Sequence, residues 1–206
     1  MNFRISALTF LIFASFFISC STKEPLEPEE EIPCLMPLAI GNSWSEIIRL
    51  YYPSGEISMT ITGSSTVTSR VIIDNEYWYR IDKEFNYMGD ITHSYHFLCH
   101  KVNGLWYRSD VAATPELKIK YPLVQGEITQ LENGYKELVS LDTIITVPAG
   151  TFNCYYWRSY CTSNTCRTHQ FFAPGYGYIK YINELTDDYG YFFTEQLTET
   201  NSLNLQ

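Results

Sequence analysis

Residues 147–181, VPAGTFNCYYWRSYCTSNTCRTHQFFAPGYGYIKY, decide the fold that this sequence predicts. Pro148 and Gly150 interrupt regular structure, and six of the next ten residues are aromatic or cysteine, a composition typical of a β-strand. A polar, turn-like segment follows, and Pro174 and Gly175 mark a second turn. The stretch therefore predicts three consecutive antiparallel strands over residues 151–160, 166–172 and 176–182.

Elsewhere the chain alternates apolar and polar residues with period two. In residues 56–62 and 116–121 every second residue is apolar, which gives each strand one apolar and one polar face. Hairpin turns are predicted at residues 53–55, 74–75, 103–104 and 133–134. Asn103-Gly104 is the strongest of these turn signals, because a type I′ turn needs positive φ at both residues.

No window of the sequence shows a helical apolar stripe with caps at its ends. We therefore predict a mainly β fold with little helix. The expected architecture is a single antiparallel meander sheet of roughly ten to twelve strands, curled into a barrel or half-barrel. Residues 34–206 are long enough to form one domain with its own core.

The first twenty residues predict export and lipidation. Arg4 precedes an apolar run over residues 5–18, and Ser19-Cys20 closes it, which is the pattern of a signal peptide over residues 1–19. The run is shorter than the roughly 20 residues that a helix needs to cross a bilayer. The ending Phe17-Ile18-Ser19-Cys20 resembles a lipobox, which implies cleavage before Cys20 and acylation of Cys20. The alternative is a plain secretory leader.

Residues 20–33 read as the lipidated cysteine and an acidic tether rich in proline and glutamate, too polar to fold alone. We expect an outer-membrane lipoprotein of the cell envelope. The acidic run is compatible with the cell surface and equally with a spacer on the periplasmic face. The formal net charge is −9, and no basic cluster occurs, which argues against a nucleic-acid partner. The membrane contact is therefore expected through the N-terminal lipid.

Three motifs resemble a family of uncharacterised Bacteroidetes-type lipoproteins. They are PLAIGNSW over residues 37–44, VPAGTF over residues 147–152, and APGYGYIK over residues 173–180. A weaker echo over residues 121–126 lacks the Asn and Trp of the first motif. The resemblance implies no reaction. Some relatives look like the half-barrels of bacterial lipoprotein carriers, which is an analogy of fold alone.

The remaining cysteines favour one disulfide and leave others open. Cys161 and Cys166 flank a four-residue turn, so they can face each other across a hairpin at a separation that suits a disulfide. Cys99 with Cys154, or Cys34 with either of them, are alternatives among which the sequence does not choose.

The sequence carries weak signals for a metal or for catalysis. One metal reading is the cluster His93, His96, Cys99 and His100. In a strand, His96 and His100 share a face but lie about 13 Å apart, too far to share one zinc ion, and His93 and Cys99 point to the other face. A second metal reading combines Cys161, Cys166 and His169. No nucleophile motif is present, and the carboxylate pairs Asp187-Asp188 and Asp82/Glu84 read as solvated. We expect no enzyme activity, no catalytic residue, no metal and no cofactor.

Aromatic residues make up 16% of the chain and are more informative than these metal and catalytic signals. Clusters of rings fall on both faces of several expected strands, so one set packs in the core and the other lies under a second layer, lines a cavity or is exposed. We predict a non-enzymatic module that binds a lipid, a glycan or a protein partner through an aromatic-lined concave sheet. The alternatives are a structural subunit of a surface complex and a metal-dependent enzyme. The ligand-binding candidates are Trp78, Trp106, Trp157, Tyr176 and Tyr178.

Overall fold

The computed structural model describes residues 34–131, 133–162, 166–186 and 192–205. These residues belong to one compact unit, Ile32–Gln206. The signal peptide over residues 1–19, the lipidation site Cys20, the tether and the pair Asp187-Asp188 lie outside the described residues. The described part consists of strands and turns without a helix, so the mainly β prediction is confirmed. It therefore also contains no helix that could cross a membrane.

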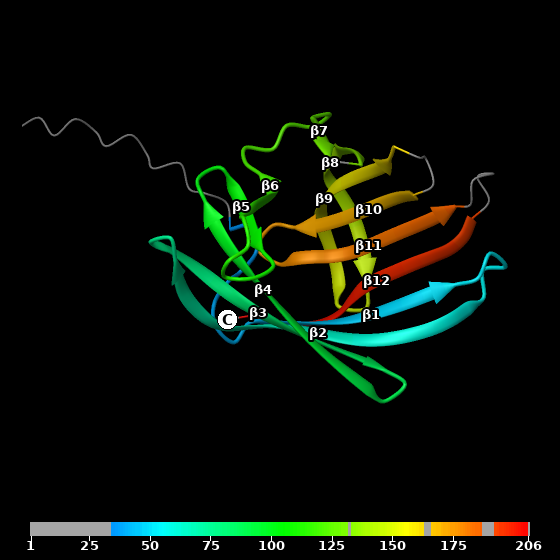
Figure 1. Ribbon diagram of the computed structural model, residues 1–206. Helices are drawn as coiled ribbons and strands as arrows, with labels where there is room; N and C mark the ends of the chain where they lie inside the picture. The colour runs from blue at the N-terminus through cyan, green and yellow to red at the C-terminus, as the bar shows by residue number, and fades with distance from the viewer. Residues whose placement is uncertain (1–33, 132, 163–165, 187–191, 206) are drawn as a thin grey trace, which may run out of the picture. The chain divides into compact units, whose positions relative to one another are not determined.

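The described residues form twelve strands, at the upper end of the expected number (Figure 1). The strands predicted over residues 151–160, 166–172 and 176–182 correspond to three of them. The full set is β1 (Ser43–Tyr51), β2 (Ile57–Ile73), β3 (Glu76–Tyr87), β4 (Asp90–Lys101), β5 (Gly104–Arg108), β6 (Glu116–Lys120), β7 (Ile128–Leu131), β8 (Gly134–Val147), β9 (Gly150–Cys161), β10 (Cys166–Ala173), β11 (Gly177–Thr186) and β12 (Phe192–Asn204).

All twelve strands belong to one antiparallel sheet, in the order β6-β5-β4-β3-β2-β1-β12-β11-β10-β9-β8-β7. The first and last strands, β1 and β12, pair in the middle of the sheet, so two meanders join there. The two edges, β6 and β7, follow each other in the chain. In Figure 1 the sheet curls until both edges lie at the top of the view, opposite β1. An ion pair between Lys120 and Glu127 joins the two edge regions. This is a curled sheet compatible with the predicted half-barrel.

The hairpin turns follow the predicted positions, with one correction of type. Asp74 and Asn75 both have positive φ, of 53° and 62°, as a type I′ turn requires. The type I′ prediction for Asn103-Gly104 is wrong, because Gly104 is already the first residue of β5 and pairs with Lys101. Glycine is needed there for another reason. A Cβ on Gly104 would lie 1.9 Å from the carbonyl oxygen of Ile119.

The concave face of the sheet holds the main core. Residues from nearly every strand pack there, and the segment before β1 lies among them, with Leu35, Met36 and Leu38 buried. That segment is fixed by main-chain contacts, since Gly175 N donates to Cys34 O at 2.7 Å. It also contacts β4, where a ring nitrogen of His100 lies 2.7 Å from Met36 O.

Two of the three sequence motifs meet in this core. The indole nitrogen of Trp44, in PLAIGNSW, donates to the carbonyl of Tyr176, in APGYGYIK, at 2.6 Å. Asn42 is fully buried, and its side chain donates to the carbonyl of Pro37 at 2.9 Å. Gly177 has a φ of 97°, and a Cβ there would approach the side chain of Met36 to 3.3 Å. These contacts give the residue types in both motifs a packing role.

The convex face carries two smaller clusters. Val147, Cys154, Phe171, Ala173 and Ile179 form one, on strands β8–β11. Strand β8 also contacts β11 and β12, to which it is not hydrogen-bonded. Register shifts between Leu138 and Thr143 accompany this arrangement of β8, as bulges bend a strand. The second cluster lies on β2–β5 and consists of Ile73, Trp78, Phe97 and Cys99.

Candidate ligand-binding cavities

A cavity of about 510 Å³ lies on the concave face, and we call it cavity A. Its apolar lining comes from the segment before β1 and from β1, β3, β4 and β5. Its polar lining includes Glu46, Lys83, His96 and Lys118. The apolar residues that matter below are Met36, Trp44, Ile81, Leu98 and Leu105.

A second cavity, of about 420 Å³, lies between the two edges of the sheet, and we call it cavity B. Strands β6, β7, β8 and β9 supply most of its lining, which includes Lys136 and Trp157. Lys118 and Tyr178 line both cavities, so A and B adjoin at these two side chains. Both volumes fall in the range of small-molecule sites.

Tyr178 separates the two cavities. Its ring packs edge-on against Phe172 at 5.1 Å, yet the residue keeps 42% of its surface exposed. Because Tyr178 lines both cavities, we attribute that exposure to their interior. Burial by the surrounding protein raises the pKa of Tyr178 to about 12, so its hydroxyl stays protonated at neutral pH.

The ammonium groups in cavity B differ in their partners. Lys120 pairs with Glu127, and Lys118 Nζ lies 2.8 Å from a carboxylate oxygen of Glu116. Lys136 instead lies 5.0 Å from the centre of the Trp157 ring. Burial lowers the pKa of Lys136 to about 8, and the charge of Lys118 adds to this effect.

His96 is the titratable group of cavity A most affected by its surroundings. Its ring lies 5.4 Å from the ring of Tyr107. Burial lowers the pKa of His96 to about 4, and the nearby charges of Lys83 and Lys118 act in the same direction. At neutral pH His96 is therefore an uncharged ring in the wall of the cavity.

The structure brings together two of the five predicted aromatic residues. Trp157 and Tyr178 both line cavity B. Trp78 is fully buried in the convex-face cluster, and Trp106 packs against the same cluster. Tyr176 is 45% exposed and packs on Phe152 at 5.2 Å. These last three are absent from the linings of A and B.

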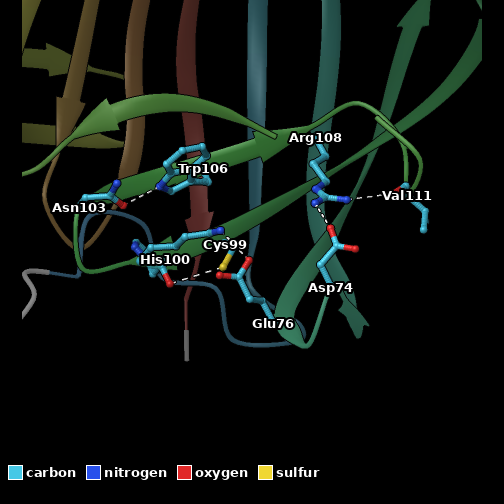
Figure 2. A network of polar contacts seen from close by, with 9 residues as sticks. Asp74, Glu76, Cys99, His100, Asn103, Trp106, Arg108 and Val111 are labelled. Atoms are coloured by element: carbon cyan, nitrogen blue, oxygen red, sulfur yellow. Dashed lines mark hydrogen bonds and ion pairs between the residues drawn. The ribbon is translucent and has the colours of Figure 1, made fainter. Parts of the chain in front are cut away.

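Figure 2 shows the polar network that includes Trp106 and Arg108. Lys101 pairs with Glu76 at 2.5 Å and lies 4.9 Å from the centre of the Trp106 ring. The guanidinium of Arg108 is buried and pairs with Asp74 (Figure 2). It lies 4.8 Å from the centre of the Trp78 ring. Each cation therefore has a carboxylate and an aromatic partner, an arrangement that accounts for these aromatic residues by packing.

The cysteines and histidines do not assemble into a metal centre in the described part of the chain. Cys161 and Cys166 form a disulfide with a Cα separation of 5.4 Å, which removes both from the thiolate ligand set. Cys34, Cys99 and Cys154 are free thiols, and Cys99 and Cys154 are buried in different clusters. Burial raises the pKa of Cys154 to about 11, so this thiol is a poor nucleophile.

A Tyr-His-Glu arrangement on β9–β11 was not foreseen. The hydroxyl of Tyr156 lies 2.7 Å from His169 Nδ1, and His169 Nε2 lies 3.5 Å from a carboxylate oxygen of Glu184. Tyr156 and His169 stack almost parallel, and neither cavity includes these residues. The carboxylates of Asp82 and Glu84 are paired with Arg80 and His93. We therefore assign all of these groups to structural ion pairs and hydrogen bonds.

Sequence reasoning missed the lysines of the cavities. Lys136 lies two residues before Leu138, which is buried in the concave core, so period two places both on the same face of β8. That pattern could have identified Lys136. Alternation placed Lys118 on the polar face of its strand. A register shift in the β5–β6 pairing lies beside Lys118. Its ammonium group lies 4.2 Å from the centre of the Tyr107 ring and lines both cavities.

Comparison with known proteins identifies a fold. No protein-family model matches the sequence. No curated protein matches it either. A solved structure from Bacteroides fragilis, described as an exported protein with a YmcC-like fold, is 11% identical with a TM-score of 0.55. One from Parabacteroides distasonis, described as a lipoprotein, is 12% identical with a TM-score of 0.55. Each alignment covers 84% of this chain and 99% of the other. At this identity the likeness establishes a shared fold.

Proposed function

We propose that this protein is a lipid-anchored binding module of the outer membrane, without enzymatic activity, whose concave face holds an apolar ligand such as a lipid. The observation that carries the proposal is the pair of adjoining cavities, which share Tyr178 and Lys118. A core packed without gaps would have filled the concave face. The curled sheet instead leaves cavities of about 510 Å³ and 420 Å³ beside buried aromatic rings.

The anchor is proposed from the lipobox-like ending at Cys20 and the acidic tether that follows. The two proteins of similar fold are described as exported and as a lipoprotein, which agrees with a location in the cell envelope. Intact mass spectrometry of the protein extracted from its own membrane tests the anchor. We expect cleavage before Cys20, three acyl chains and, after unfolding without reductant, three alkylatable thiols. An unlipidated mature chain would overturn the anchor.

Ligand binding is tested with an uncharged fluorescent probe, 1-aminoanthracene, and a variant that fills cavity B. Ser159 lines this cavity, so Ser159→Trp should abolish the fluorescence gain on probe binding. Thr60→Trp, at an exposed position of β2, is the matched control and should bind the probe like the parent chain. Equal binding by the Ser159→Trp variant, or no binding by the parent, would contradict the proposed site.

A second candidate function is a structural subunit of a surface complex. Edge strand β7 is exposed at every residue, and Ile128 and Leu131 retain 57% and 48% of their surface. Such an edge can pair with another chain. Light scattering of the purified full chain distinguishes the two candidates, since the subunit model requires assembly and the binding-module model requires a ligand-competent monomer.

A further inference from the structure

We propose that the ligand is a single-chain amphiphile with one anionic head group, bound between Lys118 and Lys136 in cavity B, with its apolar tail passing Tyr178 into cavity A. This inference rests on the proposed function and narrows it by naming the chemistry of the ligand. A carboxylate and a phosphate head both fit that chemistry.

Lysines outnumber carboxylates in the lining of cavity B. Three lysines line it, against the two carboxylates Glu116 and Glu127. Those carboxylates pair with Lys118 and Lys120, and within the described part of the chain no carboxylate pairs with Lys136. This cationic surplus lies inside a chain whose formal net charge is −9. An anion is the ligand that completes it.

Aromatic rings hold the ammonium groups of both lysines. Lys136 lies over the ring of Trp157 at 5.0 Å, and Lys118 lies over the ring of Tyr107 at 4.2 Å. A cation placed over an aromatic face keeps N–H groups available to a second partner. Holding Lys136 charged in a half-buried position costs free energy of folding, and such costs are typical of binding sites.

The same cavity contains an amide group with an unsatisfied oxygen. Gln170 lines cavity B, and its amide oxygen is buried without a hydrogen-bond partner in the described part of the chain. Buried polar groups of this kind usually have a partner. Because the amide oxygen is enclosed, the NH₂ group is the end of this side chain that an anionic head group in cavity B can reach.

Cavity A offers apolar surface to the tail of the ligand. Beyond Tyr178, cavity A is bordered by Trp44, Leu98 and Leu105, all buried in the main core. His96 adds an uncharged ring at neutral pH. An extended acyl chain gains free energy from such a lining in proportion to the apolar area it buries.

The test is a displacement titration with the full chain, kept in an amphipathic polymer so that no detergent competes. The bound probe is 11-(dansylamino)undecanoate, and the competitors are hexadecanoate, hexadecyl phosphate and hexadecanol. We expect at least one of the two anions to displace the probe at a concentration about tenfold below that of hexadecanol, as one charged hydrogen bond requires. The stronger anion identifies the head group as a carboxylate or a phosphate.

Variants assign the effect to the lysines. Lys136→Met keeps the length of the side chain and removes its charge. The affinity for the anions should therefore fall about tenfold, while the affinity for hexadecanol should change less than about twofold. Lys118→Met is a second variant with the same expectation. Arg70→Met removes one cation from an exposed position beside Tyr77 and should behave like the parent.

The possible failures are distinguishable. If hexadecanol and the anions displace the probe equally, or if both lysine variants bind like the parent, the anionic head group is overturned and the proposed lipid site stands. If neither the probe nor any competitor binds, the proposed function fails together with this inference.

Discussion

The ammonium group of Lys136 lies 5.0 Å from the centre of the Trp157 indole, inside a cavity whose other lysines are paired with carboxylates. A lysine in this position contributes little to folding, because burial penalises its charged form. It is therefore a residue whose charge does not favour the folded state, and it leads to the first prediction.

Lys136→Met should stabilise the ligand-free protein at pH 7, by on the order of 1–2 kcal/mol. The folded pKa of about 8 lies below the unfolded value, so between these two values the unfolded chain binds more protons and stability rises with pH. The difference in free energy of unfolding between variant and parent should have its full value below pH 8 and should vanish above about pH 10.4. Urea denaturation at pH 7 and pH 10.5 measures it, and an unchanged difference at the two values would contradict the assignment.

The low pKa of His96 implies that the folded protein loses stability as the pH falls below neutral. Its pKa of about 4 lies below the unfolded value of roughly 6.5, so the unfolded chain takes up the proton first as the pH falls. Stability should drop between pH 6.5 and pH 4, by on the order of 2 kcal/mol from this residue. The other charged groups of cavity A are Glu46, Lys83 and Lys118. His96→Gln should flatten this part of the profile in thermal unfolding.

A side chain at position 104 should clash with the neighbouring strand, and a second glycine with positive φ serves as the control. A Cβ at Gly104 would lie 1.9 Å from the carbonyl oxygen of Ile119, in addition to the strain of a φ of 141°. Gly89 also has positive φ, at 98°, but its Cβ would meet nothing within 4 Å. We expect Gly104→Ala to cost more than about 3 kcal/mol and Gly89→Ala about 1–2 kcal/mol in chemical denaturation. Similar costs for both variants would show that β5 and β6 are not so closely apposed.

The Cys161–Cys166 disulfide should give a modest stabilisation. It joins residues five positions apart, so it restricts the unfolded chain less than a 15-residue loop, for which the entropic gain is about 3 kcal/mol. Replacing both cysteines by Ser should therefore lower the free energy of unfolding by less than this amount. A loss well above it, measured with cavity binding in parallel, would mean that the hairpin depends on the bond.

Much of the fold could be predicted from local pattern. Alternation and turn residues located the strands, because each strand buries one face and each turn needs particular φ values. The pairing of β1 with β12 could not be read in this way, since it joins segments about 150 residues apart through backbone hydrogen bonds that leave no local pattern. The turn before Gly104 was misplaced because Asn-Gly marks a type I′ turn only when no neighbouring strand requires the glycine.

The site was predicted only in outline. Clusters of aromatic residues indicated that rings would occupy both faces, and Trp157 and Tyr178 do line a cavity. Trp78 and Trp106 pack on the convex face, and local pattern does not say which face of a curled sheet is concave. The cavity lysines were missed because an isolated lysine on a strand reads as solvated, and only the curling of the sheet brings Lys118 and Lys136 to one site.

The most direct test of the central claim is a crystal structure of the full chain with 12-bromododecanoate, using the anomalous signal of bromine to locate the tail. The account predicts a carboxylate within about 3 Å of Lys136 Nζ and a bromine peak in cavity A, bordered by Trp44 and Leu98. A bromine peak outside the concave face, or a carboxylate distant from both Lys118 and Lys136, would contradict it.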